Sequence, residues 1–159
     1  MNFEELFKKA YKAAEKGELN EAEELYKQCL DLHQSPEVWN NLGNVYRRME
    51  KTAKAIECYQ KAIELDKDYA PAYVNLASTL LNLERYDNAK LLLLRAVEVG
   101  MKDQRVTAML IVCHLALEEF FQAVDLYVSN MKDMALLEEL SEYEVLEKLE
   151  NLRKEWKKP

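Results

Sequence analysis

The chain has 159 residues, of which 49% are hydrophobic and 32% charged, and its formal net charge at pH 7 is −7. This length predicts a single domain around one core, and the acidic balance argues against nucleic acid or an anionic membrane as partner, because phosphate groups bind to basic surfaces. There are only three glycines and three prolines, so we expect long helices rather than a β-rich fold with many tight turns.

Targeting signals and disulfides are not expected. The stretch from Met1 to Lys16 carries several Glu and Lys side chains and no apolar run, unlike a signal peptide. No uncharged apolar run approaches the roughly 18 residues of a membrane span, so no membrane insertion is expected. The three cysteines, Cys29, Cys58 and Cys113, are far apart and form no C-x-x-C pair. We therefore expect buried, reduced thiols in a cytoplasmic protein.

Two helices are predicted in residues 36–69, the stretch with the clearest pattern. They should span about 36–49 and 52–65, because Ser35 is a good N-cap and Pro36 is favoured at the first helical position. Apolar and small residues recur on one face of each helix. These residues are Trp39, Leu42, Gly43 and Tyr46 in the first helix, and Ala55, Tyr59 and Ala62 in the second.

Similar helix pairs are expected before and after this stretch. A pair at about 70–103 repeats the pattern with Tyr73, Leu76, Ala77, Leu80, Ala89, Leu93 and Ala96. A pair at about 3–35 comes first, and Gly17 should end its first helix. A degraded pair at about 104–137 has His114 in place of the tyrosine. A helical tail at about 138–158 follows, in which Ser141 and Glu144 fit a capping box.

The order and spacing of these residues resemble the tetratricopeptide repeat, a helix–turn–helix unit of about 34 residues. The resemblance covers about residues 3–133 and is most specific at 36–99. It implies an all-α fold, a right-handed α-solenoid of antiparallel helix pairs with a C-terminal capping helix. One unit cannot bury its own apolar face, so neighbouring copies should stack. Gly43 and Ala77 are small where the two helices of a unit should cross closely.

The resemblance also implies a binding surface. In proteins of this family, the first helices of successive repeats line a concave groove that holds peptides or partner segments. Asn41 and Asn75 occupy matching positions in successive repeats, and a side-chain amide can pair with any peptide backbone as donor and acceptor. Carried over by spacing, the partner-binding candidates are Asn41, Asn44, Arg47, Arg48, Asn75, Ser78, Arg105 and Met109, with Glu4, Lys8, Tyr11 and Glu15 as the corresponding residues of the first helix.

One subfamily of these proteins binds C-terminal carboxylates with a fixed set of Lys, Asn and other basic residues. Asn44, Asn75 and Arg105 agree with that set. Asn40 and Met109, however, replace two of its cations. Without them, most of the electrostatic attraction for a carboxylate is lost, so this carboxylate clamp is not favoured.

Catalysis is not indicated by any motif. His33 and His114 are the only histidines, and neither has a second His or Cys at the spacing of metal ligands. His114 falls on a core position of its helix, which predicts a packed histidine. The sequence contains no phosphate-binding loop and no nucleophile motif. We expect a non-enzymatic protein without cofactor or metal.

The sequence therefore predicts a protein–protein interaction module that binds a peptide or partner segment in the groove. The alternative is a self-associating scaffold whose groove is covered by its own C-terminal helix or by another copy. In the second case the chain would form a homo-oligomer. The second half of the inferred groove is apolar, and two occupants remain open for it: the tail, or a partner's apolar segment. Its residues are Val74, Leu81, Met109, Val112 and Leu115.

Overall fold

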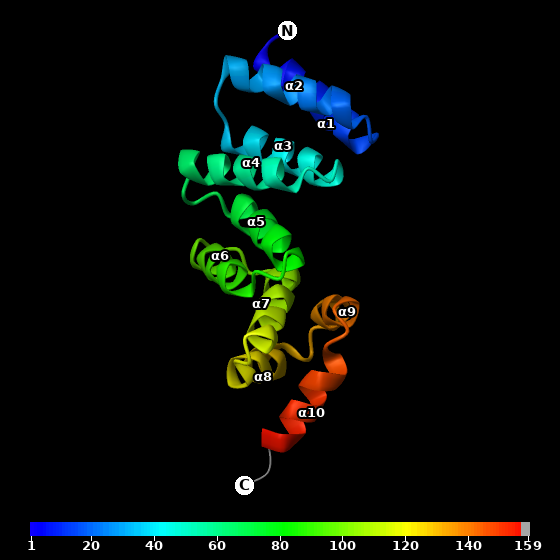
Figure 1. Ribbon diagram of the computed structural model, residues 1–159, viewed down its shortest axis with the longest axis vertical. Coiled ribbons are helices and arrows are strands. Elements are labelled where there is room, and N and C mark those ends of the chain that lie inside the picture. The colour runs from blue at the N-terminus through cyan, green and yellow to red at the C-terminus, as the bar shows by residue number, and fades with distance from the viewer. Residues whose placement is uncertain (157–159) are drawn as a thin grey trace. The chain divides into compact units, whose positions relative to one another are not determined.

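The computed structural model describes residues 1–156, and this part of the chain forms ten α-helices and no strand (Figure 1). The fold is therefore all-α, as the sequence predicts. The helices are α1 (Phe3–Glu15), α2 (Leu19–Leu32), α3 (Pro36–Arg48), α4 (Thr52–Leu65), α5 (Ala70–Asn82), α6 (Tyr86–Glu98), α7 (Gln104–Ala116), α8 (Phe120–Asn130), α9 (Met134–Glu142) and α10 (Leu146–Trp156).

The chain divides into two compact units, Met1–Thr79 and Leu80–Pro159. Unit 1 contains α1 to α4 and most of α5, whereas unit 2 contains the end of α5 and α6 to α10. Each of the four helix pairs expected from the sequence is present as two helices. Contacts in a repeat protein run only between neighbouring helices, so such a chain separates readily into groups of neighbours.

Side-chain caps begin several of these helices. Asn2 accepts a hydrogen bond from the Glu5 N–H at 2.9 Å at the start of α1, and Asp103 accepts one from the Val106 N–H at 2.9 Å at the start of α7. Ser35 caps α3 and Pro36 is its first residue, which confirms the predicted start. These caps satisfy backbone N–H groups that have no partner within the helix.

The turns between the two helices of each of the four pairs have the same backbone conformation. Gly17, Glu50, Glu84 and Glu118 all have positive φ, between +59° and +79°. In each turn two backbone N–H groups bond back to carbonyls of the helix that has just ended, as in a Schellman motif. Gly17 therefore ends α1 as predicted, but three glutamates adopt the same left-handed conformation without the freedom of glycine.

In unit 1, α1 packs against α2, α2 against α3, and α3 against α4 (Figure 1). The tightest approach lies at Gly43 of α3. A Cβ atom added at Gly43 would lie 2.6 Å from Cε1 of the fully buried Tyr59 ring. This distance confirms that the two helices cross where the sequence has its smallest residue.

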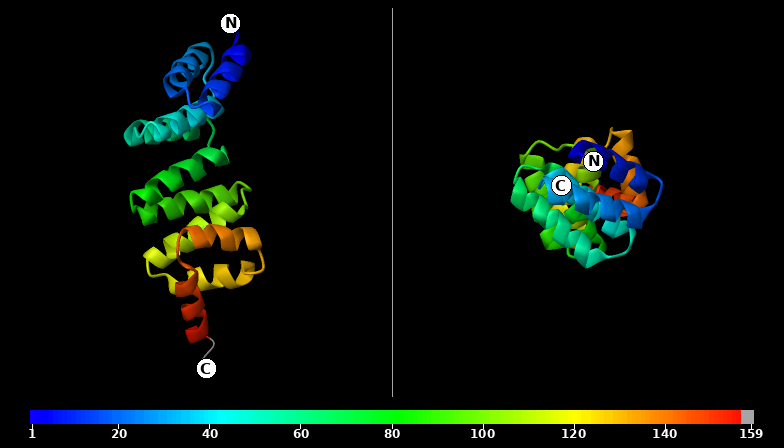
Figure 2. Two further views of the ribbon diagram at one scale, coloured as in Figure 1. Left: turned by 90° about the vertical axis from the view of Figure 1, so that its right-hand side faces the viewer. Right: turned by 90° about the horizontal axis from the view of Figure 1, so that it is seen from above.

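In unit 2, α7 packs against α6, α8 and α9, and α10 contacts α8 and α9 (Figure 2). Residues of α7, α8 and both tail helices share one buried cluster. Its members are Ala108, Ile111, Leu115, Ala123, Tyr127, Leu136, Leu140 and Leu149. The tail therefore covers the last helix pair.

The tail differs from the single capping helix that the sequence predicts. It folds as two helices, and the expected cap at about 138–158 begins inside α9 and extends to residues outside the described part of the chain. Ser141 lies within α9, and Glu144 has a φ of +58° in the turn that follows. The predicted capping box is therefore wrong, because Asp133 starts α9 earlier by accepting bonds from Ala135 and Leu136 N–H.

The three cysteines are free and buried, as the sequence predicts. Burial raises the pKa of the Cys58 thiol to about 12 and that of Cys113 to about 11, so both stay protonated thiols near neutral pH. Among the helices of residues 1–156, none is both long enough and apolar enough to cross a membrane.

Substituting Gly43 tests the close crossing of α3 and α4. Gly43→Ala places a methyl group against a fully buried ring, so one of the two must shift, and overpacking of this kind costs about 1–3 kcal/mol. Alanine also favours a helix over glycine by about 1 kcal/mol, so we expect a net loss of up to about 2 kcal/mol in the free energy of unfolding. Urea denaturation measures this loss.

The matched background for this test is Tyr59→Leu, because the next repeat has a leucine, Leu93, at the equivalent position. In a double-mutant cycle, Gly43→Ala should cost less when residue 59 is leucine, because the ring is gone. An equal cost in both backgrounds would contradict the proposed clash.

Substituting Glu50 tests the left-handed turn. Left-handed backbone costs a non-glycine residue about 1–2 kcal/mol, whereas the extra freedom of glycine in the unfolded chain costs about 0.5–1 kcal/mol. Glu50→Gly should therefore stabilise the protein by about 0.5–1 kcal/mol. The same change at Glu57, inside α4, should destabilise it by about 1 kcal/mol. Thermal or urea unfolding of the two variants must give opposite signs if the turn is strained.

Candidate functional site

A cavity of about 180 Å³ lies between α1 and α3 in unit 1. We call it the α1–α3 pocket. Its walls come from the first helices of the first two predicted repeats, with one tyrosine of α2 behind them. The lining residues are Tyr11, Ala14 and Glu15 of α1, Tyr26 of α2, and Asn41, Asn44, Val45 and Arg48 of α3.

Helical spacing explains why these residues meet. Asn41, Asn44 and Arg48 follow one another at intervals of three and four, which places them on one face of α3. Tyr11 and Glu15 are likewise one turn apart on α1. The structure thus brings together three of the predicted partner-binding residues, Asn41, Asn44 and Arg48, with two of the residues expected from the first helix.

Two hydrogen bonds hold the pocket's polar side chains in place. The Arg48 guanidinium donates from Nη1 to the Ala14 carbonyl oxygen at 2.6 Å, which ties the end of α1 to α3. The Tyr59 hydroxyl donates to Oδ1 of Asn44 at 2.6 Å. Because the Asn44 oxygen is held by Tyr59, its amide nitrogen is directed away from that bond. The pocket is therefore lined by an amide that Tyr59 holds in one orientation and by the cation of Arg48.

The phenols of Tyr26 and Tyr59 are neutral at physiological pH. Burial raises the pKa of Tyr26 to about 12, although a hydrogen bond with Asn41 acts in the opposite direction. Burial also raises the pKa of Tyr59 to about 12, against a smaller lowering by the nearby charge of Arg47. Charging either phenol would put an anion into a poorly solvated position. Tyr59 therefore remains a hydrogen-bond donor to Asn44.

Asn75 lies elsewhere, in a buried amide pair with Asn40. Its Nδ2 donates to Oδ1 of Asn40 at 2.9 Å, and the two residues are 9% and 5% exposed. The pair joins α5 to α3 inside unit 1. A buried amide must find such a partner, because an unpaired polar group away from water is costly. Asn75 thus has a structural partner that the repeat spacing does not predict.

The other predicted residues fall outside the α1–α3 pocket. Arg47 and Ser78 are half-buried in unit 1, on α3 and α5. Arg105 is exposed at the start of α7 in unit 2. Met109 is 1% exposed, so its side chain offers no surface to a ligand. Leu115 is also buried, and it shares the buried cluster with two leucines of α9, so the tail covers this apolar part of α7.

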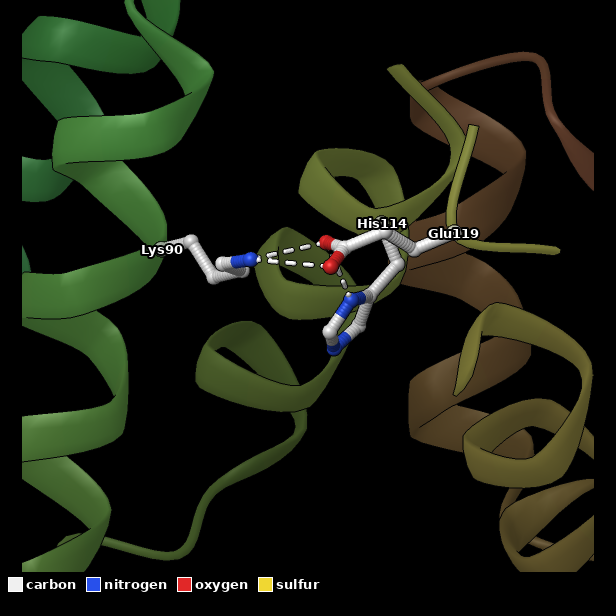
Figure 3. A network of polar contacts seen from close by, with 3 residues as sticks. All are labelled: Lys90, His114 and Glu119. Carbon is white, nitrogen blue, oxygen red and sulfur yellow. Dashed lines mark hydrogen bonds and ion pairs between the residues drawn. The ribbon is translucent and has the colours of Figure 1, made fainter. Parts of the chain in front are cut away.

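A network of polar contacts in unit 2 joins three successive elements (Figure 3). Lys90 of α6 lies 2.8 Å and 3.0 Å from the two carboxylate oxygens of Glu119, which precedes α8. Nδ1 of His114, on α7, lies 3.1 Å from the same carboxylate. The hydrogen bonds from Lys90 and then His114 lower the pKa of Glu119. His114 is buried, as predicted, and its contact is structural: it connects α7 to the turn before α8.

Residues that could hold a metal ion do not gather in the described structure. Within residues 1–156, no group of three or more His, Cys, Asp or Glu side chains is placed to bind one. The α1–α3 pocket has one carboxylate, Glu15, and its other polar groups are amides, phenols and a guanidinium. Such a set is suited to hydrogen bonding with a peptide rather than to metal coordination.

Sequence reasoning missed the parts of the site that depend on contacts between helices. The Ala14 carbonyl that receives Arg48 is a backbone group, and no residue pattern points to it. Tyr59 was expected only as a core residue, although its hydroxyl orients Asn44. The sequence does contain one signal for this contact. Tyr59 is expected in the core, and the hydroxyl of a buried phenol normally forms a hydrogen bond, which predicts a polar partner such as Asn44 nearby.

Paired helices that recur with the same turn chemistry define a helical-repeat protein. A family model described as tetratricopeptide repeat matches residues 36–69, and a second model with that description matches residues 58–90. In residues 36–90 the chain carries the sequence of the tetratricopeptide repeat family. Over 89 residues it is 32% identical to the cell division cycle protein 27 homolog of Caenorhabditis elegans, covering 56% of this chain and 11% of that protein. The chain thus spans about a tenth of the length of the curated relatives it matches.

Solved structures share the fold. The first TPR of Spaghetti (RPAP3), bound to the HSP90 peptide SRMEEVD, superposes with a TM-score of 0.70 at 24% identity, covering 74% of this chain and 96% of that one. PilF of Pseudomonas aeruginosa superposes with a TM-score of 0.78 at 20% identity, covering 91% and 66%. At these identities the likeness shows the fold alone.

Raising the pH tests the state of the buried phenols. The folded-state pKa of Tyr59 and Tyr26 is about 12, above the ordinary 10.0, so the folded chain keeps protons that the unfolded chain releases. The stability from these groups is complete below pH 10 and should be lost as the pH rises toward 12. Urea unfolding at increasing pH should show this loss, with a smaller slope in Tyr59→Phe. A wild-type midpoint that stays constant up to pH 12 would contradict the assignment.

Proposed function

We propose that this chain is a non-enzymatic protein–protein interaction module that binds an extended peptide or partner segment in the α1–α3 pocket. The observation that carries the proposal is the convergence of Asn41, Asn44 and Arg48 with Tyr11 on one cavity between two first helices. A similar solved structure, the first TPR of Spaghetti, has an HSP90 peptide bound. The family's first helices line its binding grooves, and the pocket lies between two such helices.

The chemistry of the pocket favours a backbone with carbonyl groups and an acidic or polar side chain. Amide N–H groups of Asn41 and Asn44 can donate to peptide carbonyls, and Arg48 can donate to a carboxylate or carbonyl. Tyr11, half exposed, supplies an aromatic surface for an apolar side chain next to these donors. Glu15 places one negative charge at the edge, which disfavours a strongly acidic segment passing over α1.

Further contacts extend the proposed site along α3 and α5. Arg47 and Ser78, half-buried in unit 1, are flanking contacts in this proposal. Asn75 supports the site indirectly through its bond to Asn40. Met109 lies outside the proposed site because it is buried, and Arg105 belongs to a separate exposed position in unit 2.

The experiment starts from a displayed library of short random peptides, because the natural partner is unknown. Selection on the full chain yields labelled peptides for titration by fluorescence anisotropy. Asn41→Ala combined with Arg48→Ala should weaken their binding about tenfold or more, since hydrogen bonds with a charged partner contribute about 1.5–3 kcal/mol. Circular dichroism must show unchanged helicity in the variant.

The matched control removes the same two kinds of side chain elsewhere. Arg85→Ala with Asn88→Ala changes an exposed guanidinium and an exposed amide at the start of α6, and it should leave the affinity unchanged. If both double variants bind equally well, the site is not the α1–α3 pocket. If selection enriches no peptide at all, the proposed function is overturned.

A further inference from the structure

Helix α8 carries an exposed apolar ridge in unit 2. Phe121 is 67% exposed and Val128 is 44% exposed, and a spacing of two helical turns puts them on one face of the helix. Asp125 lies between them on the same face and is also exposed. We call Phe121, Asp125 and Val128 the α8 ridge. A contiguous apolar patch on a protein surface, rather than a single apolar side chain, marks a contact with another molecule.

The other repeats indicate that the fold does not need apolar residues at these positions. The counterparts of Phe121 in the earlier second helices are Asn20, Ala53 and Asp87. Two of the three counterparts of Val128 are also polar, Lys27 and Gln60, and the third is Leu94. Stacking of the repeats therefore tolerates polar or small residues where α8 has phenylalanine and valine.

The tail covers the ridge only in part. The rings of Phe121 and Trp156 approach with their centroids 5.6 Å apart, yet Trp156 is itself 44% exposed. If the ridge served only to hold α10, both rings would be buried against each other. An exposed aromatic pair at the end of the ridge instead enlarges the apolar surface.

Helix α1 carries a surface of complementary chemistry in unit 1. A shallow cavity of about 410 Å³ on this helix is lined by Phe7, Lys8, Tyr11, Lys12 and Glu15. We call these residues the α1 shelf. Phe7 and Tyr11 provide an aromatic floor one helical turn long, and Lys8 and Lys12 are also one turn apart and flank it. The shelf thus combines an aromatic surface with two cations and one carboxylate, Glu15, so its net charge is positive, and the α8 ridge combines an aromatic surface with an anion.

We propose that the α8 ridge of one copy of this chain docks on the α1 shelf of a second copy. Phe121 contacts the aromatic floor, and Asp125 pairs with Lys8 or Lys12. Desolvation of the aromatic rings supplies most of the attraction, and the ion pairs select the register. Two helices that pack in this way lie about 8–10 Å apart, which brings side chains of both faces into contact.

The proposed contact is heterologous, because it joins two different surfaces. Each copy keeps one free ridge or one free shelf after pairing, so association continues into a ring or an open chain. The apparent mass should therefore rise with protein concentration. It should also fall as salt is added, because exposed ion pairs are screened.

Sedimentation velocity of the full chain over about a hundredfold range of concentration tests the proposal by mass action. Wild type should grow in mass. Phe121→Ala should weaken the association about tenfold or more, as truncation of a buried aromatic anchor does. Lys8→Glu with Lys12→Glu, which reverses the charge of the shelf, should weaken it to a similar degree. Leu32→Ala, at an exposed leucine in neither surface, is the matched control and should associate like wild type.

Mixing the two defective chains gives the sharpest result. The Phe121→Ala chain keeps an intact shelf, and the Lys8→Glu, Lys12→Glu chain keeps an intact ridge, so together they should form a 1:1 complex that grows no further. A wild-type chain that stays monomeric at every concentration overturns the proposal, as does a mixture that remains two monomers. These measurements follow mass in the absence of any peptide, so a failure of this proposal can be told apart from a failure of peptide binding in the α1–α3 pocket.

Discussion

The contact between Gly43 and Tyr59 is the constraint on which unit 1 depends. A repeat of two helices has too little apolar surface to fold alone, so its helices must approach closely and then stack on neighbours. At Gly43 the approach is so close that a Cβ would lie 2.6 Å from the ring. The same approach directs the Tyr59 hydroxyl to Asn44, one residue further along α3. One packing contact therefore fixes both the core of the unit and the orientation of a side chain in the candidate site.

Local features of the chain were predictable from the sequence. The start of α3 at Ser35 and Pro36 follows from capping, and the end of α1 at Gly17 follows from backbone freedom. Both depend on residues within one turn of the helix end. The predicted capping box at Ser141 is wrong although its residues fit the pattern. Helix α9 begins after Asp133 and extends through Ser141, so this serine does not start a helix.

Features that depend on contacts between helices were less predictable. Repeat spacing placed Asn41, Asn44 and Arg48 on one face, and the structure joins them in one pocket. The same spacing makes Asn75 the repeat equivalent of Asn41. In the structure, however, Asn75 forms its hydrogen bond with Asn40, which precedes Asn41 in the chain and lies on the buried side of α3. A shift of one position around a helix turns a side chain by about 100°, so spacing alone does not separate a groove residue from a buried one. Burial of Met109 under neighbouring helices has the same origin.

Each unit contains a polar contact at the equivalent position of its repeats, but the residues that form it differ. In unit 1 the Tyr46 hydroxyl donates to Glu23 of α2 at 3.0 Å, and Lys27 lies 2.7 Å from that carboxylate. In unit 2 the counterpart of Tyr46 is His114, which contacts Glu119 together with Lys90. Each arrangement brings a polar tip, a carboxylate and a lysine together beside a first helix. His114, which stands in place of the tyrosine, therefore keeps a polar contact with a carboxylate at this position.

Tyr11 connects the two proposed binding surfaces physically. It lines the α1–α3 pocket with Asn41 and Arg48, and it also lies on the α1 shelf with Lys8 and Lys12. A bound peptide and a docked α8 ridge would both contact the Tyr11 ring. They therefore cannot bind at the same time. Binding of either would then weaken the other by the same factor, since thermodynamic coupling between two binding events is reciprocal. Self-association would in this way set the concentration of chains whose pocket is open to a partner.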